Sequence, residues 1–495
     1  MTVSAGRTPS LAVSLIPVVV LIALLAASVA LFGDASASGP SQIALILAAA
    51  VGVVIGIAHG HAWRALEEGI VHGISLSMAA VLILLVVGAL IGSWILAGIV
   101  PTMIYYGLQL LTPAIFFPSA CALCCLVSLA TGSSWTTAGT VGVALIGIAA
   151  AQELSLGLAA GAVISGAYFG DKMSPLSDTT NLAPAMAGTD LFTHIRHMMW
   201  TTTPSIILAL ILFAVIGMRN AAPQDTTAVN TILEALRAQF QIGLHLLLPV
   251  ALVLFMVVRK VPATPALLIG ALTGCVFAVI FQQQAVITYA ATPGLPAWAA
   301  LIKGAWMSLF DGYKLASGNP TLDELLSGGG MASMLPTVWL ILAAMIFGAV
   351  MEATGMLARI ATSILSMVRG TGSLVAATLA TALGMNVVAS DQYIAIVIPG
   401  RMFRAEYARR RLHPKNLSRS LEDAGTVTSP LVPWNTCGAF MAGTLGVATL
   451  TYLPFAFFNL INPFVALIYG FTGFTIEKLP PGEETPVVAP VADQT

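Results

Sequence analysis

The sequence predicts an all-α polytopic membrane protein with about 11–13 transmembrane helices, since each crossing needs roughly 17–25 residues. We expect these helices to form two structural repeats, inverted relative to each other, with broken helices at the membrane midplane. The first observation is composition: 58% of the 495 residues are hydrophobic and 8% are charged, whereas soluble domains carry about 25% charged residues. The second observation is a series of long apolar runs, and the third is that the two halves of the chain contain similar motifs in the same order.

The apolar runs define the expected crossings. They lie at 11–32, 42–58, 75–100, 101–130, 137–160, 199–217, 239–258, 264–282, 334–357, 371–398 and 437–472. Some exceed one span and must contain a break or a second helix. The run 11–32 is longer than the core of a signal peptide, so we interpret it as a first membrane helix, with a cleaved signal as the alternative. The amphipathic segment 297–318 is a further crossing or an interfacial helix.

Three motifs recur in the same order in the two halves. Gly88 and its neighbours match Gly348, Gly132 matches Gly384, and Ser174–Asn181 matches Ser429–Asn435, at nearly constant offsets along the chain. Paired interrupted segments of this kind indicate the binding site of a secondary transporter. We therefore divide the chain into an N-terminal segment with the first helix (1–40), a first repeat half (41–220), connecting helices and a loop (221–333), a second repeat half (334–478) and a disordered tail (479–495).

The stretch 166–184 is the strongest candidate for half of an ion site. It lies between apolar segments, yet it combines two carboxylates with several neutral oxygens, and Pro175 prevents a continuous helix. Carboxylates inside a membrane mark ion or proton pathways, and irregular backbone persists there only inside protein or beside a wet cavity. The candidate ion- or proton-binding residues are Asp178, Asp171, Thr179, Asn181 and Ser174. The alternative is a polar loop outside the bilayer.

Three further polar breaks supply candidate ligands. The segment 131–140 offers the hydroxyls of Thr136 and Thr137, which can instead bond within their own helix. Asp391 interrupts an apolar run, and it either binds a cation or caps a restarting helix. The segment 422–437 contains the second-repeat candidates Thr428, Ser429 and Asn435.

Glu352 is a further candidate carboxylate, with a pair to Arg359 as its structural alternative. In total, acids outnumber bases in the expected membrane zone. This balance favours a cation or protons over a bare organic anion, and we predict Na⁺ at Asp178 and Asp391. Lys172 is the exception, because it either neutralises Asp171 or competes with a bound cation.

Basic residues concentrate between Arg401 and Arg419, and the positive-inside rule places that segment in the cytoplasm. This predicts a multi-pass membrane protein with that segment on the cytoplasmic side. The net charge of −1 gives no reason to expect nucleic acid as a partner. Membrane lipid is an expected partner, and a homodimer is a candidate assembly.

The motifs resemble those of a known family. The stretch 166–183 resembles the signature of NhaC-type sodium/proton antiporters, and 428–439 is similar to that family's second signature. The resemblance extends over most of residues 40–475. It implies an inner-membrane transporter that exchanges internal Na⁺ for external H⁺, whose relatives also move organic acids and amino acids.

Residues and resemblance together predict a secondary transporter, not an enzyme, that exchanges Na⁺ for H⁺ by competition for buried carboxylates. Burial disfavours the charged form of a carboxyl group, so the same group can hold a proton or, once ionised, Na⁺. No cofactor is expected beyond the transported Na⁺ and H⁺, and Li⁺ is a further candidate cation. The alternative is a Na⁺- or H⁺-coupled exchanger or symporter of a small organic acid or amino acid, with Trp135, Lys172 and Trp434 as recognition residues. A channel or an intramembrane aspartyl enzyme would leave the duplicated breaks unexplained.

Overall fold

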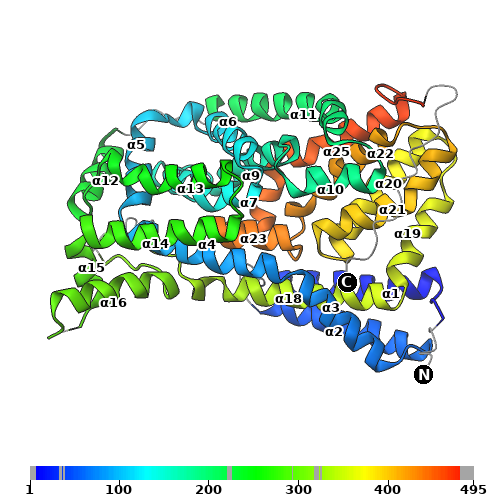
Figure 1. Ribbon diagram of the computed structural model, residues 1–495, viewed down its shortest axis with the longest axis horizontal. Coiled ribbons are helices and arrows are strands. Elements are labelled where there is room, and N and C mark those ends of the chain that lie inside the picture. Colours follow the sequence, from blue (N-terminus) through cyan, green and yellow to red (C-terminus); the bar gives the residue numbers. More distant parts are fainter. Residues whose placement is uncertain are drawn as a thin grey trace.

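The protein is a bundle of helices in which the shorter, broken ones lie in the middle (Figure 1). The computed structural model describes residues 7–32, 36, 39–219, 226–292, 294–316, 323 and 326–479, with side chains left out at 226–229. These residues contain helices and two isolated β-bridges but no β-strand. The all-α prediction is therefore confirmed. The tail predicted for 479–495 lies, apart from Leu479, outside the described residues.

Nine described helices are long and apolar enough to cross a membrane, or up to eleven if each of two sharply bent helix pairs is one span. The larger count, eleven, equals the lower limit of the 11–13 membrane helices predicted from the sequence. One bent pair joins 230–239 to 244–258 at 83°, and the other joins 436–445 to 449–455 at 89°. The first helix, α1 (Leu11–Phe32), has the bounds of the first apolar run.

The first half contains the elements that carry the first two polar breaks. They are α4 (Met78–Leu96), α5 (Ile99–Leu110), α6 (Pro113–Thr131), α7 (Ser134–Thr137), the π-helix η2 (Ala138–Gly142), α8 (Val143–Ala151), α9 (Leu156–Met173), α10 (Asp178–Ala187) and α11 (Leu191–Arg219). Breaks at 132–133 and 174–177 separate α6 from α7 and α9 from α10. Of the window 134–151, 72% is buried, so this segment lies deep in the bundle.

The second half contains the elements that carry the other two polar breaks. It comprises η4 (Met331–Met334), α18 (Leu335–Ala353), α19 (Met356–Ser366), α20 (Thr371–Val388), α21 (Gln392–Arg409), α22 (Pro414–Leu421), the π-helix η5 (Glu422–Thr426), η6 (Ser429–Leu431), α23 (Thr436–Leu445), α24 (Thr449–Tyr452), η7 (Leu453–Phe455) and α25 (Phe457–Thr472).

Corresponding helices of the two halves begin at a constant interval along the sequence. The interval is identical for the starts of α6 and α20 (Pro113, Thr371), α7 and α21 (Ser134, Gln392), α9 and α22 (Leu156, Pro414), α10 and α23 (Asp178, Thr436), and α11 and α24 (Leu191, Thr449). The offsets taken from the sequence motifs miss this structural register, in which Gly132 corresponds to Ser390 rather than to Gly384. Both residues have a positive φ, 71° and 60°. The inverted orientation of the halves stays a prediction.

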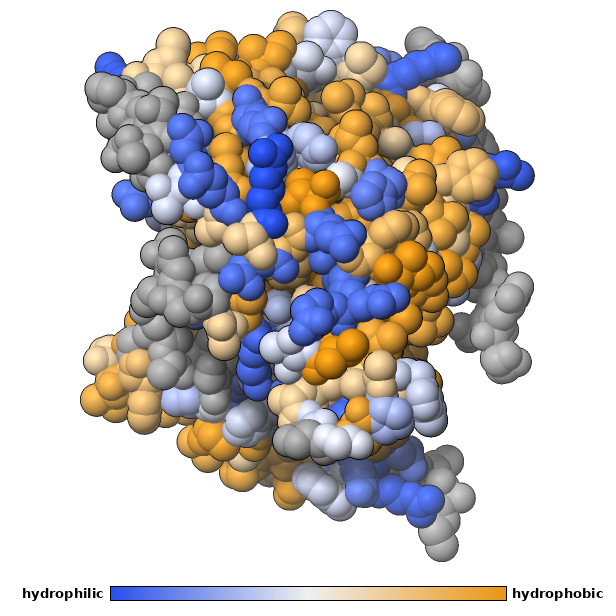
Figure 2. Space-filling model, turned by 90° about the vertical axis from the view of Figure 1, so that its left-hand side faces the viewer, coloured by the Kyte–Doolittle hydropathy of each residue, from blue (hydrophilic) through white to orange (hydrophobic). Residues whose placement is uncertain are grey.

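The remaining helices flank this repeated unit. They are α2 (Pro40–Ala58), α3 (Trp63–Leu76), α12 (Thr226–Gln239), η3 (Leu244–Leu247), α13 (Leu248–Val258), α14 (Ala263–Phe281), α15 (Gln283–Ala290) and α16 (Ala297–Phe310). At 14 residues, α16 is too short for an ordinary crossing. Figure 2 shows the end of the molecule near α5, α12 and α15, where hydrophilic residues gather beside hydrophobic surface.

Candidate functional site

Each polar break stops one helix and restarts another with a side-chain cap. Ser133 accepts a hydrogen bond from the Thr136 amide, and Ser177 accepts one from the Thr180 amide. In the second half, Asp391 and Asn435 cap α21 and α23 in the same way. Ser, Asp and Asn are the residue types that satisfy the free N–H groups at a helix start, so the local sequence explains why the chain restarts at these four positions.

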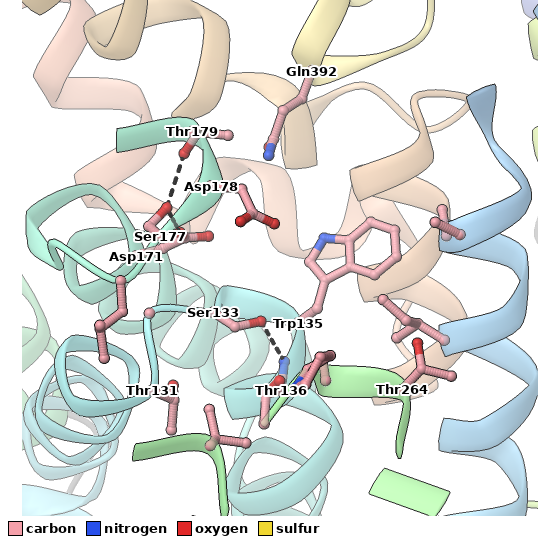
Figure 3. A pocket seen from close by; sticks show the side chains of 18 of the residues that line it. Thr131, Ser133, Trp135, Thr136, Asp171, Ser177, Asp178, Thr179, Thr264 and Gln392 are labelled. Carbon is pink, nitrogen blue, oxygen red and sulfur yellow. Dashed lines mark hydrogen bonds between the residues drawn. The ribbon is translucent and has the colours of Figure 1, made fainter. Parts of the chain in front are cut away.

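The breaks of both halves meet at a cavity of about 710 Å³ (Figure 3). Three carboxylates line it: Asp171 and Asp178 from the first half and Asp391 from the second. Neutral groups accompany them, including Ser133, Thr136, Thr179, Asn181, Gln392 and Thr436. The cavity wall is completed by the α3–α4 corner and the α13–α14 loop, whose Lys260 is the single cation among the lining residues.

Asp171 is held by hydroxyl groups rather than by a cation. Its Oδ2 accepts hydrogen bonds from the amide nitrogen of Ser134 at 3.1 Å and from the Ser134 hydroxyl at 2.6 Å. Its Oδ1 accepts a hydrogen bond from Ser177, whose hydroxyl lies 3.1 Å from that of Thr179. The side chain is buried. It therefore fixes the two first-half breaks against each other while facing the cavity.

Asp178 is the acid that is free to bind a ligand. It is the first residue of α10, it is exposed to the cavity, and no hydrogen bond or ion pair to its carboxylate is found among the described residues. Figure 3 shows its carboxylate between Gln392 and Trp135, directed into the cavity. A carboxylate at the first turn of a helix is also favoured by the helix dipole.

Asp391 shows the cap that was one of the two interpretations left open by the sequence. Its Oδ1 caps α21 by accepting hydrogen bonds from the amides of Tyr393 at 2.9 Å and Ile394 at 3.1 Å. Its Oδ2 lies 3.5 Å from the Thr436 hydroxyl and borders the cavity. The cap is thus present in the structure, and one oxygen remains for a weak contact or a ligand. The role of Asp391 as a Na⁺ ligand stays a prediction.

The polar contacts of one half have counterparts in the other. In the first half, the hydroxyl of Ser134 donates a hydrogen bond to Asp171. In the second half, Gln392 begins the helix that corresponds to the one begun by Ser134, and it accepts a hydrogen bond of 3.0 Å from Ser429. Asp391 corresponds in the same register to Ser133, and Thr436 corresponds to Asp178. The two halves therefore have the same arrangement of helix starts but carry carboxylates at different positions within it. As a result, acids from both halves line the cavity, and each lies opposite neutral side chains.

Several predicted residues lie outside the cavity lining. These are Thr137, Ser174, Thr428, Ser429, Asn435 and Glu352. The hydroxyls of Thr137 and Thr428 bond to backbone carbonyls four residues earlier, at 2.9 and 2.7 Å, which is the structural alternative considered for such residues. Ser429 and Asn435 support the neighbouring Gln392 and Asn386. Glu352 is exposed on α18, and no salt bridge to Arg359 is found within the described ranges.

Lys172 does not pair with Asp171. It is completely buried and forms an ion pair with Asp423 of the second half. Neither Lys172 nor Trp434 lines the cavity; the Trp434 ring nitrogen donates to the Val387 carbonyl at 2.7 Å. Of the three proposed recognition residues, only Trp135 borders the cavity, where its ring stacks on Phe440 with centroids 4.0 Å apart.

The sequence analysis included Ser133 and Ser134 in the polar segment 131–140 without singling them out, and it did not select Gln392. Ser133 and Ser134 are small and neutral, and they become significant only because Asp171 and Asp178 lie opposite. Gln392 follows Asp391 directly, and aligning the halves by their helix starts would have found it as the counterpart of Ser134.

The arrangement can bind a hard cation by oxygen atoms. Carboxylate, hydroxyl and amide oxygens are the ligands that such ions prefer. No group of three His, Cys, Asp or Glu residues is close enough to hold one metal ion in the part of the chain that the structure describes. A cation at Asp178 would thus be completed by neutral oxygens.

Comparisons with known proteins identify the family of this chain. The model of the Na⁺/H⁺ antiporter family matches residues 166–474. The chain is 39% identical to the Na⁺/H⁺ antiporter NhaC of Alkalihalophilus pseudofirmus, over 89% of this chain and 91% of the relative.

Two other relatives are named for different activities. One is the malate-2H⁺/Na⁺-lactate antiporter of Bacillus subtilis, 37% identical over 88% of this chain and 90% of that protein. Another is the arginine/ornithine antiporter ArcD of Halobacterium salinarum, 36% identical over 97% of this chain and 95% of that protein. The chain is thus a multi-pass transporter rather than an enzyme, and it belongs to the Na⁺/H⁺ antiporter family.

Proposed function

We propose that this protein exchanges Na⁺ for H⁺ across the bacterial inner membrane by competition for the carboxylates of the central cavity. The observation that carries the proposal is the lining itself: Asp171, Asp178 and Asp391 face one cavity and Lys260 is the one cation among its lining residues. With all three acids ionised, the lining has a surplus of negative charge that a cation relieves. Protons relieve the same surplus, so the two ions exclude each other.

The role of each acid follows from its partners. Asp178 has no hydrogen-bond partner among the described residues, so it binds Na⁺ directly. Asp171 is held by two serines, which allow it to stabilise a nearby cation without moving. Asp391 supplies one oxygen from the opposite half. Opening the cavity to one side and then the other would turn this competition into exchange, and each net charge moved is worth about 2.3 kcal/mol per 100 mV.

The test uses purified protein in liposomes with a pH-sensitive dye inside. Addition of Na⁺ outside should change the internal pH, Li⁺ should act more weakly or equally, and K⁺ serves as the cation control. Asp178→Asn keeps the size of the side chain and removes its charge, so Na⁺-driven pH change should fall to that of empty liposomes. Normal exchange by folded Asp178→Asn protein would contradict the assignment of Asp178.

A small organic substrate is the second candidate, favoured by cavity volume. A volume of about 710 Å³ lies within the roughly 300–1,000 Å³ typical of ligand sites and far exceeds the need of a bare cation. Trp135 offers an aromatic surface for such a molecule. If an organic acid or amino acid is carried, Na⁺ uptake into liposomes will depend on its presence; Na⁺-driven pH change without any organic solute favours the first proposal.

A further inference from the structure

A second group of buried charges lies beside the cavity but does not line it. Lys172, Arg419, Glu422 and Asp423 are each at most 1% exposed, and none of them borders the cavity. They come from α9, α22 and η5, so both halves of the molecule contribute. Charges buried this deeply are costly unless each is paired, which makes their partners informative.

Asp423 is supported at one of its two carboxylate oxygens, while its Oδ2 has no hydrogen-bond partner among the described residues. Its Oδ1 pairs with Lys172 and accepts hydrogen bonds from Thr201 of α11 and Asn462 of α25, both at 2.9 Å. Arg419 lies one turn earlier, with its Nε 3.9 Å from Asp423 Oδ2, and its guanidinium donates a hydrogen bond of 2.8 Å to Thr475. Asp423 is therefore held as a carboxylate by two cations.

Glu422 is not supported in this way. Neither of its carboxyl oxygens has a hydrogen-bond partner among the described residues, although the side chain is completely buried. The hydroxyl of Thr426, one turn later, likewise has no hydrogen-bond partner among the described residues. An unpaired buried carboxylate is strongly disfavoured, so the protonated form is the stable one in this arrangement.

The proton of Glu422 sets the charge of the group. With two cations and Asp423 ionised, the four residues carry one net positive charge when Glu422 is protonated and none when it is ionised. The charged groups that act on Glu422 are Lys172, Asp171 and Asp423. Neighbouring helices contribute the other charged groups around this turn. His194 of α11 lies near Lys172. The charged residue of α10 is Asp178 at the cavity, α21 is charged from Arg401 onward, and α20 and α25 contain no carboxyl or amine.

The group is connected to the cavity through consecutive residues. Asp171 faces the cavity and Lys172 faces Asp423, at the end of the same helix α9. A cation bound beside Asp171 therefore adds positive charge next to a group that already has one in excess. Loss of the Glu422 proton to water removes that excess.

From this geometry we propose that Glu422 is a proton-carrying site of the exchanger, separate from the Na⁺ site and coupled to it through the Lys172–Asp423 pair. Binding of Na⁺ in the cavity breaks the O–H bond of Glu422, and its proton leaves to water. Release of Na⁺ allows Glu422 to take up a proton again. This inference rests on the exchange proposed above, and it adds a second proton, held outside the cavity, to the proton that competes with Na⁺ inside it.

The experiment separates two fluxes in liposomes that contain the full-length protein. One is Na⁺-driven pH change, and the other is exchange of labelled Na⁺ for unlabelled Na⁺ at constant pH, which needs no proton transfer. Glu422→Gln should move fewer protons per Na⁺ than the wild type, with a smaller Na⁺-driven pH change, and keep Na⁺/Na⁺ exchange at the wild-type level. Glu234→Gln, which changes an exposed carboxyl on α12, is the matched control and should keep both fluxes.

The other outcomes contradict the inference. If Glu422→Gln still drives a normal pH change, the residue does not carry the proton. If folded Glu422→Gln protein loses both fluxes, residue 422 serves Na⁺ binding or movement instead. If Glu422→Gln does not fold, Glu422→Asp replaces it and should shift the pH of half-maximal exchange; an unchanged midpoint overturns the assignment. A wild-type protein without Na⁺-driven pH change refutes the proposed function as well.

Discussion

At the scale of single residues, the three cavity acids differ in what surrounds them. Asp178 is unpaired among the described residues, Asp171 accepts hydrogen bonds from two serines, and Asp391 caps a helix with one of its oxygens. In the proposed function these differences would give each acid a separate role, because a carboxylate that already accepts several hydrogen bonds gains less from a new cation than a free one does.

The dual position of Asp391 gives a prediction. Asp391→Asn keeps an oxygen for the Tyr393 and Ile394 amides, since Asn caps helices about as well as Asp, but it removes the charge that borders the cavity. We expect unchanged thermal stability, and a Na⁺ concentration for half-maximal exchange that rises by at least about tenfold, which corresponds to roughly 1.4 kcal/mol of lost cation affinity.

Asp391→Ala is the comparison for this prediction, because it removes the cap as well as the charge. It should lose stability by about 1 kcal/mol relative to Asp391→Asn. Exchange would be measured across a Na⁺ series and stability by thermal unfolding in detergent. An Asn variant with the wild-type half-saturation point would mean that Asp391 acts only as a cap.

At the scale of elements, the site depends on two breaks packed directly against each other. Gly132 ends α6 with φ of 71°, and a Cβ atom there would lie 2.7 Å from the Leu176 side chain and 2.9 Å from the Ser177 amide. The glycine is required for two reasons: its backbone conformation is unfavourable for other residues, and the α9–α10 break occupies the space around it.

These two reasons can be separated by experiment. Gly446 ends α23 with φ of 68°, but a Cβ atom there would have no neighbour within 4 Å, so Gly446→Ala should cost only the backbone term of about 1–2 kcal/mol. Gly132→Ala should cost that amount plus a steric penalty of typically about 1–3 kcal/mol. It should also reduce Na⁺ exchange, because Ser177 and its bond to Asp171 must shift. Equal loss of thermal stability in the two variants would show that Leu176 can move away from the new Cβ atom without a measurable steric cost.

At the scale of the whole molecule, the two halves are joined by a buried ion pair. Lys172 and Asp423 are 251 residues apart in the sequence, and Asp423 also binds Thr201 and Asn462. One carboxylate thus connects α9, α11, η5 and α25. This connection explains how a change of charge in the cavity could reach the second half.

A double-mutant cycle tests the strength of this connection. Asp423→Asn leaves Lys172 buried without its counter-charge and should cost about 3–5 kcal/mol. Adding Lys172→Met removes the stranded charge, while the amide oxygen of residue 423 still accepts bonds from Thr201 and Asn462. The double variant should therefore regain much of the stability, as measured by thermal unfolding in detergent. If the two losses simply add, the pair contributes no coupling between the halves.

The sequence by itself determined the class of protein and the positions of the breaks. Composition and run length suffice to predict membrane helices, because lipid demands apolar surface over a fixed length. The breaks could be located because proline, clustered hydroxyls and capping residues act within a few positions along the chain. Asp171, Asp178 and Asp391 stood out because they are acids in apolar surroundings.

Only the tertiary structure decided which of these groups meet. The register between the two halves, the partner of Lys172, the burial of Arg419 inside the basic segment and the position of Glu352 away from the cavity all depend on which helices pack together. Nothing near Lys172 in the sequence indicates Asp423, since Asp171 is its neighbour along the chain. A buried charge takes the partner that the packed helices bring to it, and that choice is made by contacts between residues hundreds of positions apart.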